Sequence, residues 1–284
     1  MGLFSDVLLS VDFDRTLTAA DSSIPERNLE AIRYFMAEGG AFTVNTGRSL
    51  AMSRDFLKQV PLNAPLLVYN GGAAYDTRKE EFVFRHEIPL PQGQTLREII
   101  RLCPGRLVEL QGVSAHYVFE PNPVWESYCR RGGVRGEVVG MDDDLGPFLK
   151  LCVIEGLRDS TVDGLFHATP EELARMDQAE AALRGLFGSA ATVLRVAPRT
   201  LDIVAPGVSK GKAARELQTM LGKKLLVCIG DERNDLPMLE MADYSFCPAD
   251  GAVADRYPNV CPCAEGAVAD VITKKIPEIL KRNS

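Results

Sequence analysis

Short apolar runs alternate with amphipathic stretches in the N-terminal part of the chain. The run Val7–Val11 is apolar at nearly every position, as expected for a strand that is buried on both faces of a parallel sheet. Residues 22–40 begin with serine and proline, repeat apolar side chains at helical spacing and end in two glycines, so they predict a helix. Residues 41–45 and 65–69 predict two further strands, with a helix at 50–60 between them. This order of strands and helices is typical of a parallel α/β sheet.

The same alternation returns near the C-terminus. Residues 209–221 and 234–242 have the spacing of helices, and residues 224–229 form an apolar strand. Residues 265–282 predict a long closing helix. The N-terminal and C-terminal parts therefore have the pattern of a single doubly wound α/β domain.

The pattern changes between these two parts. Strand-like apolar stretches and helical stretches follow one another there without regular alternation, as in an α+β unit. The predicted strands are 106–110, 115–119, 148–154 and 191–196, and the predicted helices are 94–102 and 170–186. We therefore predict an α/β core made of residues 1–88 and 201–284, with an α+β domain at 89–200 inserted into it.

Composition narrows the class of protein. The chain has 284 residues, of which 46% are hydrophobic and 25% are charged, and this is the make-up of a folded globular protein with one or two domains. Its formal net charge of −7 argues against sequence-independent binding of nucleic acid or of an anionic membrane, because both need an excess of lysine and arginine. An anionic ligand would therefore need local cations or a metal ion in its site.

Hydropathy and cysteine content favour a cytoplasmic protein. No stretch approaches the roughly 18 apolar residues of a membrane helix, and the N-terminal segment lacks the basic region of a secretory signal. The number of cysteines is seven, and an odd number does not favour a disulfide framework. Cys261 and Cys263 have no second pair nearby, so they do not predict a zinc site. No heptad or apolar stripe indicates an oligomeric state.

Two carboxylates follow the first predicted strand. Asp12 and Asp14 are two residues apart, so in an extended chain they point to the same side. In an open parallel sheet, ligands bind at the carboxyl ends of the strands, where these two residues lie. Taken alone, the pair is explained more simply as two solvated loop acids.

Two further segments place polar or basic residues at the start of a helix. The segment 45–48, NTGR, ends the second predicted strand with a hydroxyl group, and the backbone N–H groups of the following helix could bind a phosphate there. Lys210 follows Ser209 in the first turn of a predicted helix, where a cation opposes the helix dipole. A nearby anion would explain this placement, and a surface lysine is the simpler alternative.

The segment 228–235, CIGDERND, is the strongest single signal. An apolar strand ends in Gly-Asp, and an Asn-Asp pair then opens a helix, where one of the two acts as N-cap. Capping leaves Asp231 unexplained. Asp12, Asp14 and Asp231 at neighbouring strand ends would repel one another unless a cation joined them, and hard oxygen ligands favour Mg²⁺.

Together the four segments DFDRT, NTGR, VSKGK and GDERND, in this order, resemble the haloacid dehalogenase (HAD) superfamily, and the large insertion resembles its Cof-type (class IIB) branch of small-molecule phosphatases. The resemblance implies an α/β fold with a HAD-like doubly wound parallel sheet and an inserted α+β cap domain. It also implies a Mg²⁺-dependent phosphomonoester hydrolase. Such an enzyme would act on small phosphorylated metabolites, sugar phosphates among them, through an aspartyl-phosphate intermediate.

The resemblance further implies roles for individual residues. Asp12 would be the nucleophile, Asp14 would transfer protons to and from the reacting groups, and Thr46 and Lys210 would stabilise the transferring phosphoryl group. The residues that would bind substrate are Thr46, Gly47, Arg48, Lys210 and Asn234. The residues that would hold Mg²⁺ are Asp12, Asp14 through its backbone carbonyl, Asp231 and, beside it, Asp235.

Three positions leave alternatives open. The family usually has glycine after the second aspartate, where this chain has Arg15, so the turn either has ordinary dihedral angles or is strained. Asn70 resembles a recurrent family feature near the site, but a turn into a strand from Ala73 explains it as well. Residues 142–144, three aspartates, predict a solvated turn rather than a second cation site.

Two other functions would use the same residues. A phosphotransferase or mutase would form the same aspartyl phosphate and pass the group to another hydroxyl. A non-catalytic sensor of a phosphorylated ligand would keep the fold without the reaction. His86, His116 and His167 are scattered along the sequence and predict neither a metal triad nor a Ser–His–Asp arrangement. The sequence specifies neither the substrate nor the cap residues that select it.

Overall fold

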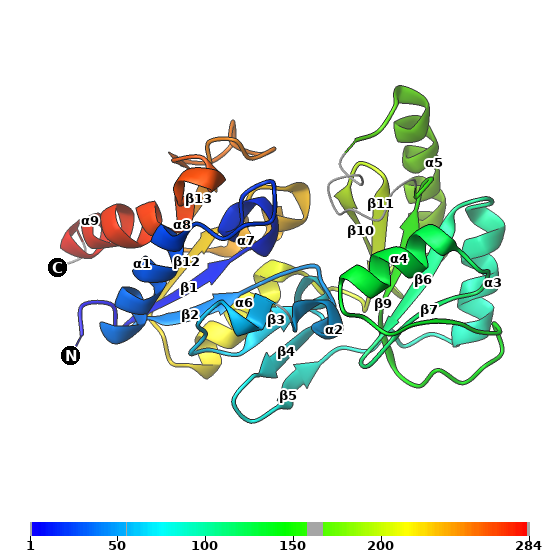
Figure 1. Ribbon diagram of the computed structural model, residues 1–284, viewed down its shortest axis with the longest axis horizontal. Helices are drawn as coiled ribbons and strands as arrows, with labels where there is room; N and C mark the ends of the chain where they lie inside the picture. The colour runs from blue at the N-terminus through cyan, green and yellow to red at the C-terminus, as the bar shows by residue number, and fades with distance from the viewer. Residues whose placement is uncertain (1, 55, 158–166, 283–284) are drawn as a thin grey trace. The chain divides into compact units, whose positions relative to one another are not determined.

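The computed structural model describes residues 2–54, 56–157 and 167–282, and the chain divides into two compact units (Figure 1). The first unit comprises Met1–Thr46, Leu57–Phe84 and Ser209–Ser284, and the second comprises Gly47–Phe56 and Arg85–Val208. The predicted boundaries, 1–88 and 201–284 around 89–200, differ from this division at both junctions and at residues 47–56. That short segment follows the first predicted strands in sequence, yet it belongs to the second unit.

A parallel sheet of five strands forms the core of the first unit, in the order β14-β13-β12-β1-β2 (Figure 1). β1 lies between β12 and β2, and all five of its residues are buried. This burial on both faces is what its continuous apolar run predicts. The strand bounds are β1 Val7–Val11, β2 Ala41–Val44, β12 Leu225–Ile229, β13 Tyr244–Pro248 and β14 Asn259–Val260.

Two groups of helices accompany this sheet. α1 packs against α8, whereas α6 packs against α7 and against β12. Leu217 of α6 and Met238 of α7 share an apolar cluster with Leu8 of β1 and Leu226 of β12. The helix bounds are α1 Glu26–Ala37, α6 Lys210–Met220, α7 Leu236–Met241, α8 Ala267–Asp270 and α9 Ile276–Arg282. The prediction of a doubly wound parallel α/β sheet is confirmed.

The segment after β2 differs from the prediction of one helix over residues 50–60. It forms the short helix α2 (Leu50–Ser53) and a separate 3-10 turn at Phe56–Lys58. The hydroxyl of Ser53 donates to the carbonyl oxygen of Ser49 at 2.8 Å. Such local side-chain bonds compete with helix continuation, which is consistent with the early end of α2.

The strand predicted at 65–69 does not continue the parallel sheet. It pairs antiparallel with the next strand in a separate three-stranded sheet, β3-β4-β5, and an isolated parallel bridge joins Leu67 to Asn45. The bounds are β3 Leu66–Val68, β4 Ala73–Asp76 and β5 Glu81–Arg85. The sequence predicts neither β13 nor β14, because β13 contains serine and proline and β14 has only two residues.

A six-stranded, mainly antiparallel sheet forms the second unit, in the order β10-β11-β9-β6-β7-β8 (Figure 1). The strand bounds are β6 Leu107–Gly112, β7 His116–Val118, β8 Gly136–Val138, β9 Phe148–Ile154, β10 Thr192–Ala197 and β11 Thr200–Val204. The helix bounds are α3 Gln92–Leu102, α4 Pro123–Arg131 and α5 Pro170–Phe187. The six predicted elements are all present, and β8, β11 and α4 are additional. The predicted α+β class of the insertion is confirmed.

The two faces of the second sheet differ in polarity because side chains alternate along each strand. In β6, Val108 and Leu110 join an apolar cluster with residues of α3 and α5. Glu109 and Gln111 alternate with them and are also buried. The buried polar residues of this second face include Glu109, Gln111, His116, Lys150 and Asp202. A sheet with one apolar face and one buried polar face can hold another segment by hydrogen bonds as well as by packing.

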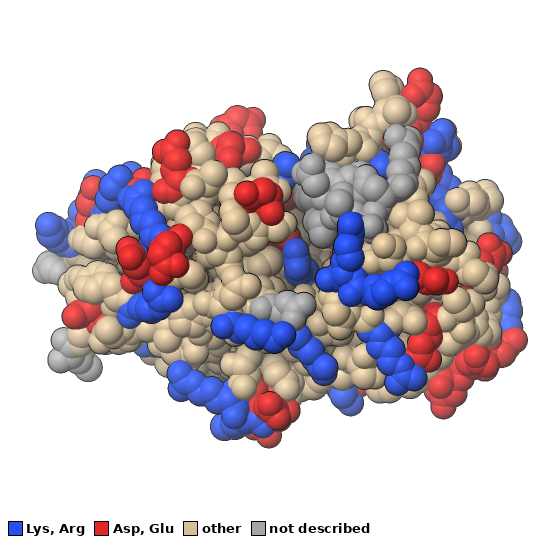
Figure 2. Space-filling view, in the orientation of Figure 1, with Lys and Arg blue, Asp and Glu red and all other residues tan. Residues whose placement is uncertain are grey.

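Charged side chains of both signs are mixed on the molecular face drawn in Figure 2. Exposed pairs such as Arg33 with Glu26 contribute little to stability, because solvent screens them. In the turn at 142–144, the side chains of Asp143 and Asp144 accept backbone N–H groups of nearby glycines. Across the described ranges, every helix is too short or too polar to cross a membrane.

One helical glycine in each unit tests how closely the atoms around it are packed. A Cβ atom on Gly211 of α6 would lie 2.0 Å from the carbonyl oxygen of Pro237, whereas one on exposed Gly185 of α5 would meet nothing within 4 Å. We expect Gly211→Ala to lower the free energy of unfolding by about 2 to 3 kcal/mol. We expect Gly185→Ala to raise it by about 0.5 to 1 kcal/mol, because alanine restricts the unfolded chain. Urea denaturation measures both, and equal stabilities of the two variants would contradict the packing described.

Candidate active site

The carboxyl ends of β1 and β12 bring two aspartates together. The strands are adjacent and parallel, with Val11 paired to Ile229, so the residues that follow them emerge at the same edge of the sheet. The N–H of Asp12 donates to the carbonyl oxygen of Ile229 at 3.0 Å, which extends the pairing by one residue. Asp231 follows two residues after the end of β12. Both side chains are buried.

Lys210 is the cation of this site. Its Nζ donates to Oδ1 of Asp12 at 2.5 Å and to Oδ1 of Asp235 at 2.6 Å, and the side chain is 1% exposed. Ser209 caps the helix that begins with Lys210 and accepts the N–H of Lys212. The placement of a lysine in the first turn of α6 is therefore explained by two nearby anions, as the sequence suggested.

The turn at 230–235 is folded around the side chain of Asp235. Its Oδ2 accepts the backbone N–H groups of Asp231 and Glu232, each at 3.0 Å. A Cβ atom on Gly230 would lie 2.6 Å from Cβ and Cγ of Asp235, so only glycine permits this close approach. Asp235 thus joins the turn to Lys210 and combines a structural with an electrostatic role.

Three polar residues outside the predicted set also support the site. Thr16 Oγ1 donates to Oδ1 of Asp231 at 2.9 Å, and Asn45 Nδ2 donates to the carbonyl oxygen of Lys210 at 2.9 Å. Asn70 Oδ1 accepts Nδ2 of Asn234 at 3.1 Å. Of these three residues, the sequence singled out only Asn70 as a residue near the site. Thr16 and Asn45 lie inside the recognised motifs, but no pattern in the sequence predicts that they bind Asp231 and Lys210.

Thr46 is joined to β3 and to the loop after it by backbone hydrogen bonds. Its N–H donates to Leu67 at 2.9 Å, and its carbonyl oxygen accepts the N–H of Asn70 at 3.1 Å. Tyr69 and Asn70 have φ angles of 55° and 56°, in the left-handed region, so this loop holds strained backbone that asparagine tolerates better than tyrosine. Gly47 and Arg48, the remaining predicted substrate-binding residues, belong to the second unit.

Of the two alternatives for the turn after Asp14, the structure shows the strained backbone conformation. Arg15 has φ 59° and ψ 10°, a left-handed conformation that costs a residue other than glycine roughly 1 to 2 kcal/mol. The N–H of Arg15 donates to Oγ1 of Thr18 at 3.2 Å. The backbone therefore adopts here a conformation in which glycine would be unstrained, although the residue is arginine.

The site holds more negative than positive charge. Burial and the charge of Asp235 raise the pKa of Asp12 to about 7, although Lys210 opposes both effects. Burial and the charges of Asp12 and Asp235 also raise the pKa of Asp231 well above its ordinary value. The pKa of Lys210 is raised by the two aspartates against the opposing effect of burial, so it stays protonated.

These residues fit a divalent cation. Carboxylate oxygens of Asp12, Asp231 and Asp235 lie within 4.8 Å of one another, and all three residues are buried. One lysine cannot balance three carboxylates, and an all-oxygen donor set suits a hard cation such as Mg²⁺. The side chain of Asp14 is not among the three clustered ligands, and the predicted role of its backbone carbonyl stays a prediction.

Comparison with known proteins finds relatives along nearly the whole chain. Residues 9–254 match the family model of haloacid dehalogenase-like hydrolases. The Escherichia coli (strain K12) protein 5-amino-6-(5-phospho-D-ribitylamino)uracil phosphatase YbjI is 25% identical over 279 residues, which cover 94% of this chain and 95% of that protein.

Solved structures share the fold. The HAD subclass IIB sugar phosphatase BT4131 has a TM-score of 0.75 at 19% sequence identity, over 94% of this chain and 97% of that one. A haloacid dehalogenase-like hydrolase from Bacteroides thetaiotaomicron has a TM-score of 0.75 at 18% identity, over 94% and 98% of the two chains. At these identities the likeness establishes the arrangement of the elements.

The raised pKa of Asp231 predicts how stability depends on pH when divalent cations are removed. A carboxyl group whose pKa is raised by folding stabilises the protein most below its unfolded pKa, and this contribution is lost as the pH rises through the folded pKa. In a chelator, we expect Asp231→Asn to melt roughly 2 to 8 °C above the parent at pH 8, with a smaller difference at pH 5.

Added Mg²⁺ provides the control for this comparison. It should raise the melting temperature of the parent more than that of Asp231→Asn, because the variant lacks one carboxylate of the cluster. Scanning calorimetry or dye-based thermal unfolding measures these differences. A variant that is less stable than the parent at pH 8 in chelator would show that Asp231 is not under electrostatic strain.

Proposed function

The chain belongs to the haloacid dehalogenase-like hydrolase family, and we propose that it is a Mg²⁺-dependent phosphatase that hydrolyses phosphomonoesters of small metabolites through an aspartyl phosphate on Asp12. The observation that carries the proposal is the buried group formed by Asp12, Asp231, Asp235 and Lys210 at the carboxyl ends of β1 and β12. A group of this kind suits a reaction in which an anionic nucleophile meets an anionic substrate.

Asp12 is the nucleophile in this proposal. One of its oxygens forms a bond to phosphorus while the bond from phosphorus to the ester oxygen breaks, and the alcohol leaves. Lys210, at 2.5 Å from Oδ1 of Asp12, holds the carboxylate in one orientation and favours its ionised form. A bound Mg²⁺ would supply positive charge that neutralises the phosphoryl oxygens.

Asp14 moves the protons. It lies two residues after the nucleophile, is only partly buried, and is near enough to raise the pKa of Asp12. In the first step it donates a proton to the leaving oxygen. In the second step it accepts a proton from the water that attacks the phosphorus of the aspartyl phosphate, which releases inorganic phosphate and restores Asp12. Two carboxylates with different surroundings can hold these different protonation states.

The substrate class is proposed from the names of similar proteins. YbjI is named for a phosphorylated ribityl compound and BT4131 for a sugar phosphate, and both match this chain almost end to end. We assign the α+β insertion the role of a cap that selects the leaving group and excludes bulk water from the phosphorylated enzyme. Thr46 would bind the phosphoryl group, and Gly47, Arg48 and Asn234 would complete the substrate site.

The first test is release of inorganic phosphate from a generic aryl phosphate. We expect activity that needs Mg²⁺, is abolished by a chelator and returns when Mg²⁺ is added back. Asp12→Asn should lower kcat by at least about 10³-fold, because asparagine cannot attack phosphorus. Asp142→Asn, on an exposed turn of the second unit, is a matched control that should keep the activity of the parent. Equal activities of parent and Asp12→Asn would show that Asp12 is not the nucleophile.

The second test separates hydrolysis from transfer to another hydroxyl. We expect water to be the acceptor, so the amounts of inorganic phosphate and of released alcohol should stay equal when glycerol or a sugar is added in excess. Phosphate that falls short of the alcohol, with a new phosphate ester in the mixture, would instead identify a phosphotransferase. Binding of a phosphorylated metabolite without any turnover would identify a sensor. Product analysis by ³¹P NMR distinguishes the three outcomes.

A further inference from the structure

The buried polar face of the second sheet holds the segment that follows Thr46. Residues 47–56 belong to the second unit, although they connect β2 to β3 of the first unit in sequence. Two hydrogen bonds and an apolar contact attach the first part of this segment to β7, β9 and α4. None of these contacts involves the group formed by Asp12, Asp231, Asp235 and Lys210.

Lys150 of β9 makes the first contact. Its Nζ donates to the carbonyl oxygen of Gly47 at 2.7 Å and to Oδ2 of Asp202 at 2.9 Å. Lys150 and Asp202 are 5% and 1% exposed, so this is a buried ion pair that also binds the backbone of the segment. Burying two charges is costly, and replacing such a pair by apolar residues often leaves a fold as stable. The ion pair is therefore better explained by its effect on geometry, which is to fix the backbone at Gly47, than by a contribution to stability.

His116 of β7 makes the second contact. Its Nδ1–H donates to Oε1 of Glu109 at 2.8 Å, and its Nε2 is hydrogen-bonded to the hydroxyl of Ser49 at 2.8 Å. Glu109 also accepts Nε1–H of Trp125 and Nε2–H of Gln111, each at 2.8 Å. Ser49 in turn accepts the N–H of Met52 and so caps α2. A continuous line of hydrogen bonds thus runs from the sheet to the start of α2.

The order Ser49–His116–Glu109 matches the order of a catalytic triad, which the scattered histidines of the sequence did not indicate. All three residues are at most 2% exposed, so no substrate reaches the Ser49 hydroxyl. Trp125 is buried as well, in line with the packing role that its apolar surroundings indicate.

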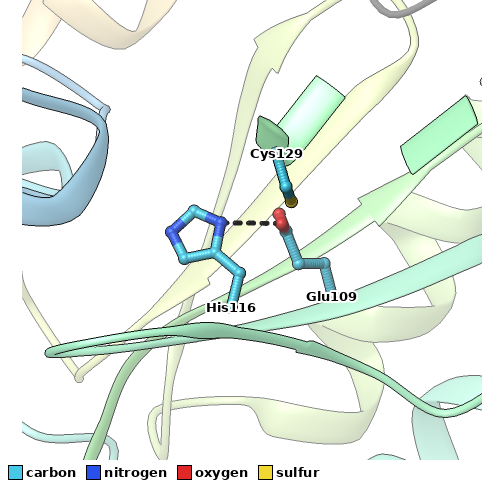
Figure 3. Close-up of side chains that lie close together, drawn as sticks. All are labelled: Glu109, His116 and Cys129. Atoms are coloured by element: carbon cyan, nitrogen blue, oxygen red, sulfur yellow. Dashed lines mark hydrogen bonds and ion pairs between the residues drawn. The ribbon is translucent and has the colours of Figure 1, made fainter. Parts of the chain in front are cut away.

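The same carboxylate is an unsuitable metal ligand. Figure 3 shows Cys129 beside Glu109 and His116, and these three residues offer clustered ligand atoms. However, Glu109 already accepts three hydrogen bonds, which together with the charge of His116 outweigh the effect of burial and lower its pKa to about 2. Burial and Glu109 raise the pKa of the Cys129 thiol to about 12, so a metal ion would displace its proton less readily than that of an ordinary cysteine.

Apolar packing completes the attachment. Ala51 and Met52 of α2 lie in one cluster with Val118 of β7 and with Trp125 and Cys129 of α4. The segment is therefore held at three successive places, at Gly47, at Ser49 and at residues 51–52. Arg48 lies between the first two of these places, with both of its neighbours hydrogen-bonded to buried side chains of the second unit.

We propose that Lys150 and His116 are positioning residues, which hold Gly47 and Ser49 so that Arg48 is oriented to bind the phosphate ester. This inference rests on the proposed function, because it assigns a purpose to the predicted substrate-binding residues Gly47 and Arg48. Preorganised binding groups lose little entropy on binding, and small displacements of such groups reduce activity strongly.

Two sets of variants test the proposal in the full-length protein. The double variant Lys150→Met/Asp202→Asn removes the bond to Gly47 without leaving an unpaired buried carboxylate, and it leaves the cap of α2 intact. Ser49→Ala removes the bond to His116 together with the cap. We expect each to raise the KM for an aryl phosphate by about tenfold with a smaller change in kcat, because Arg48 binds ground state and transition state alike.

Hydrogen exchange gives a second readout that does not depend on activity. Amide groups of residues 47–53 should exchange about tenfold faster in both variants, as expected when a local bond is lost. Ser49→Thr keeps the hydroxyl and should restore the KM and the exchange of the parent.

Arg199→Met serves as the matched control. Arg199 is a buried cation of the same unit that donates to the carbonyl oxygen of Glu155 instead of to residues 47–53. The variant Arg199→Met should lower the melting temperature without changing the KM or the amide hydrogen exchange of residues 47–53. Unchanged exchange of residues 47–53 in the two test variants, or an equal change in Arg199→Met, would overturn the proposal. An inactive parent would overturn the proposed function, whereas the exchange comparison would still decide whether the segment is attached as described.

Discussion

Three carboxylates can share a buried space around one lysine only if the fold compensates their repulsion. Here the parallel strands β1 and β12 fix Asp12 and Asp231 at one edge of the sheet, and α6 delivers Lys210 to it. Backbone N–H groups bind Asp235, and Thr16 binds Asp231, so each negative charge has a specific donor. These donors do not fully offset burial and the repulsion between the carboxylates, since the pKa values of Asp12 and Asp231 are still raised. A divalent cation bound among these carboxylates would relieve the remaining repulsion, so that cation binding, stability and the ionisation of Asp12 would depend on one another.

Strain of a second kind surrounds the same residues. Arg15, Tyr69 and Asn70 all have positive φ angles, and each lies within a few residues of a strand end that builds the site. Left-handed conformations at residues other than glycine persist only where surrounding contacts enforce them. In this chain those contacts include the bond from Arg15 to Thr18 and the bonds that join Asn70 to Thr46 and Asn234. The backbone around the site is therefore less stable by itself than the sheet that carries it.

The sequence was sufficient for the parts of the structure that follow from local pattern. The apolar run of β1, the glycines after α1 and the motif containing Asp231 predicted the parallel sheet and the family, which the family match confirms. Partners that come from distant segments could not be read in this way. Nothing in the sequence indicates that Thr16 binds Asp231 or that Asn45 binds the backbone of Lys210, because those pairs are set by how the strands stack in register. The same holds for Gly47 and Ser49, whose partners Lys150 and His116 lie 103 and 67 residues further along the chain.

Neighbouring residues Thr46 and Gly47 belong to different units, and this has a consequence for how the two units could be exchanged among relatives. Recombination that exchanged only the contiguous insertion would leave behind the residues 47, 49, 51 and 52 that contact it. The transplanted sheet would then present His116 to a foreign segment that need not carry a hydroxyl at the position of Ser49. Replacement of the second unit as a whole therefore involves two separated stretches of the sequence.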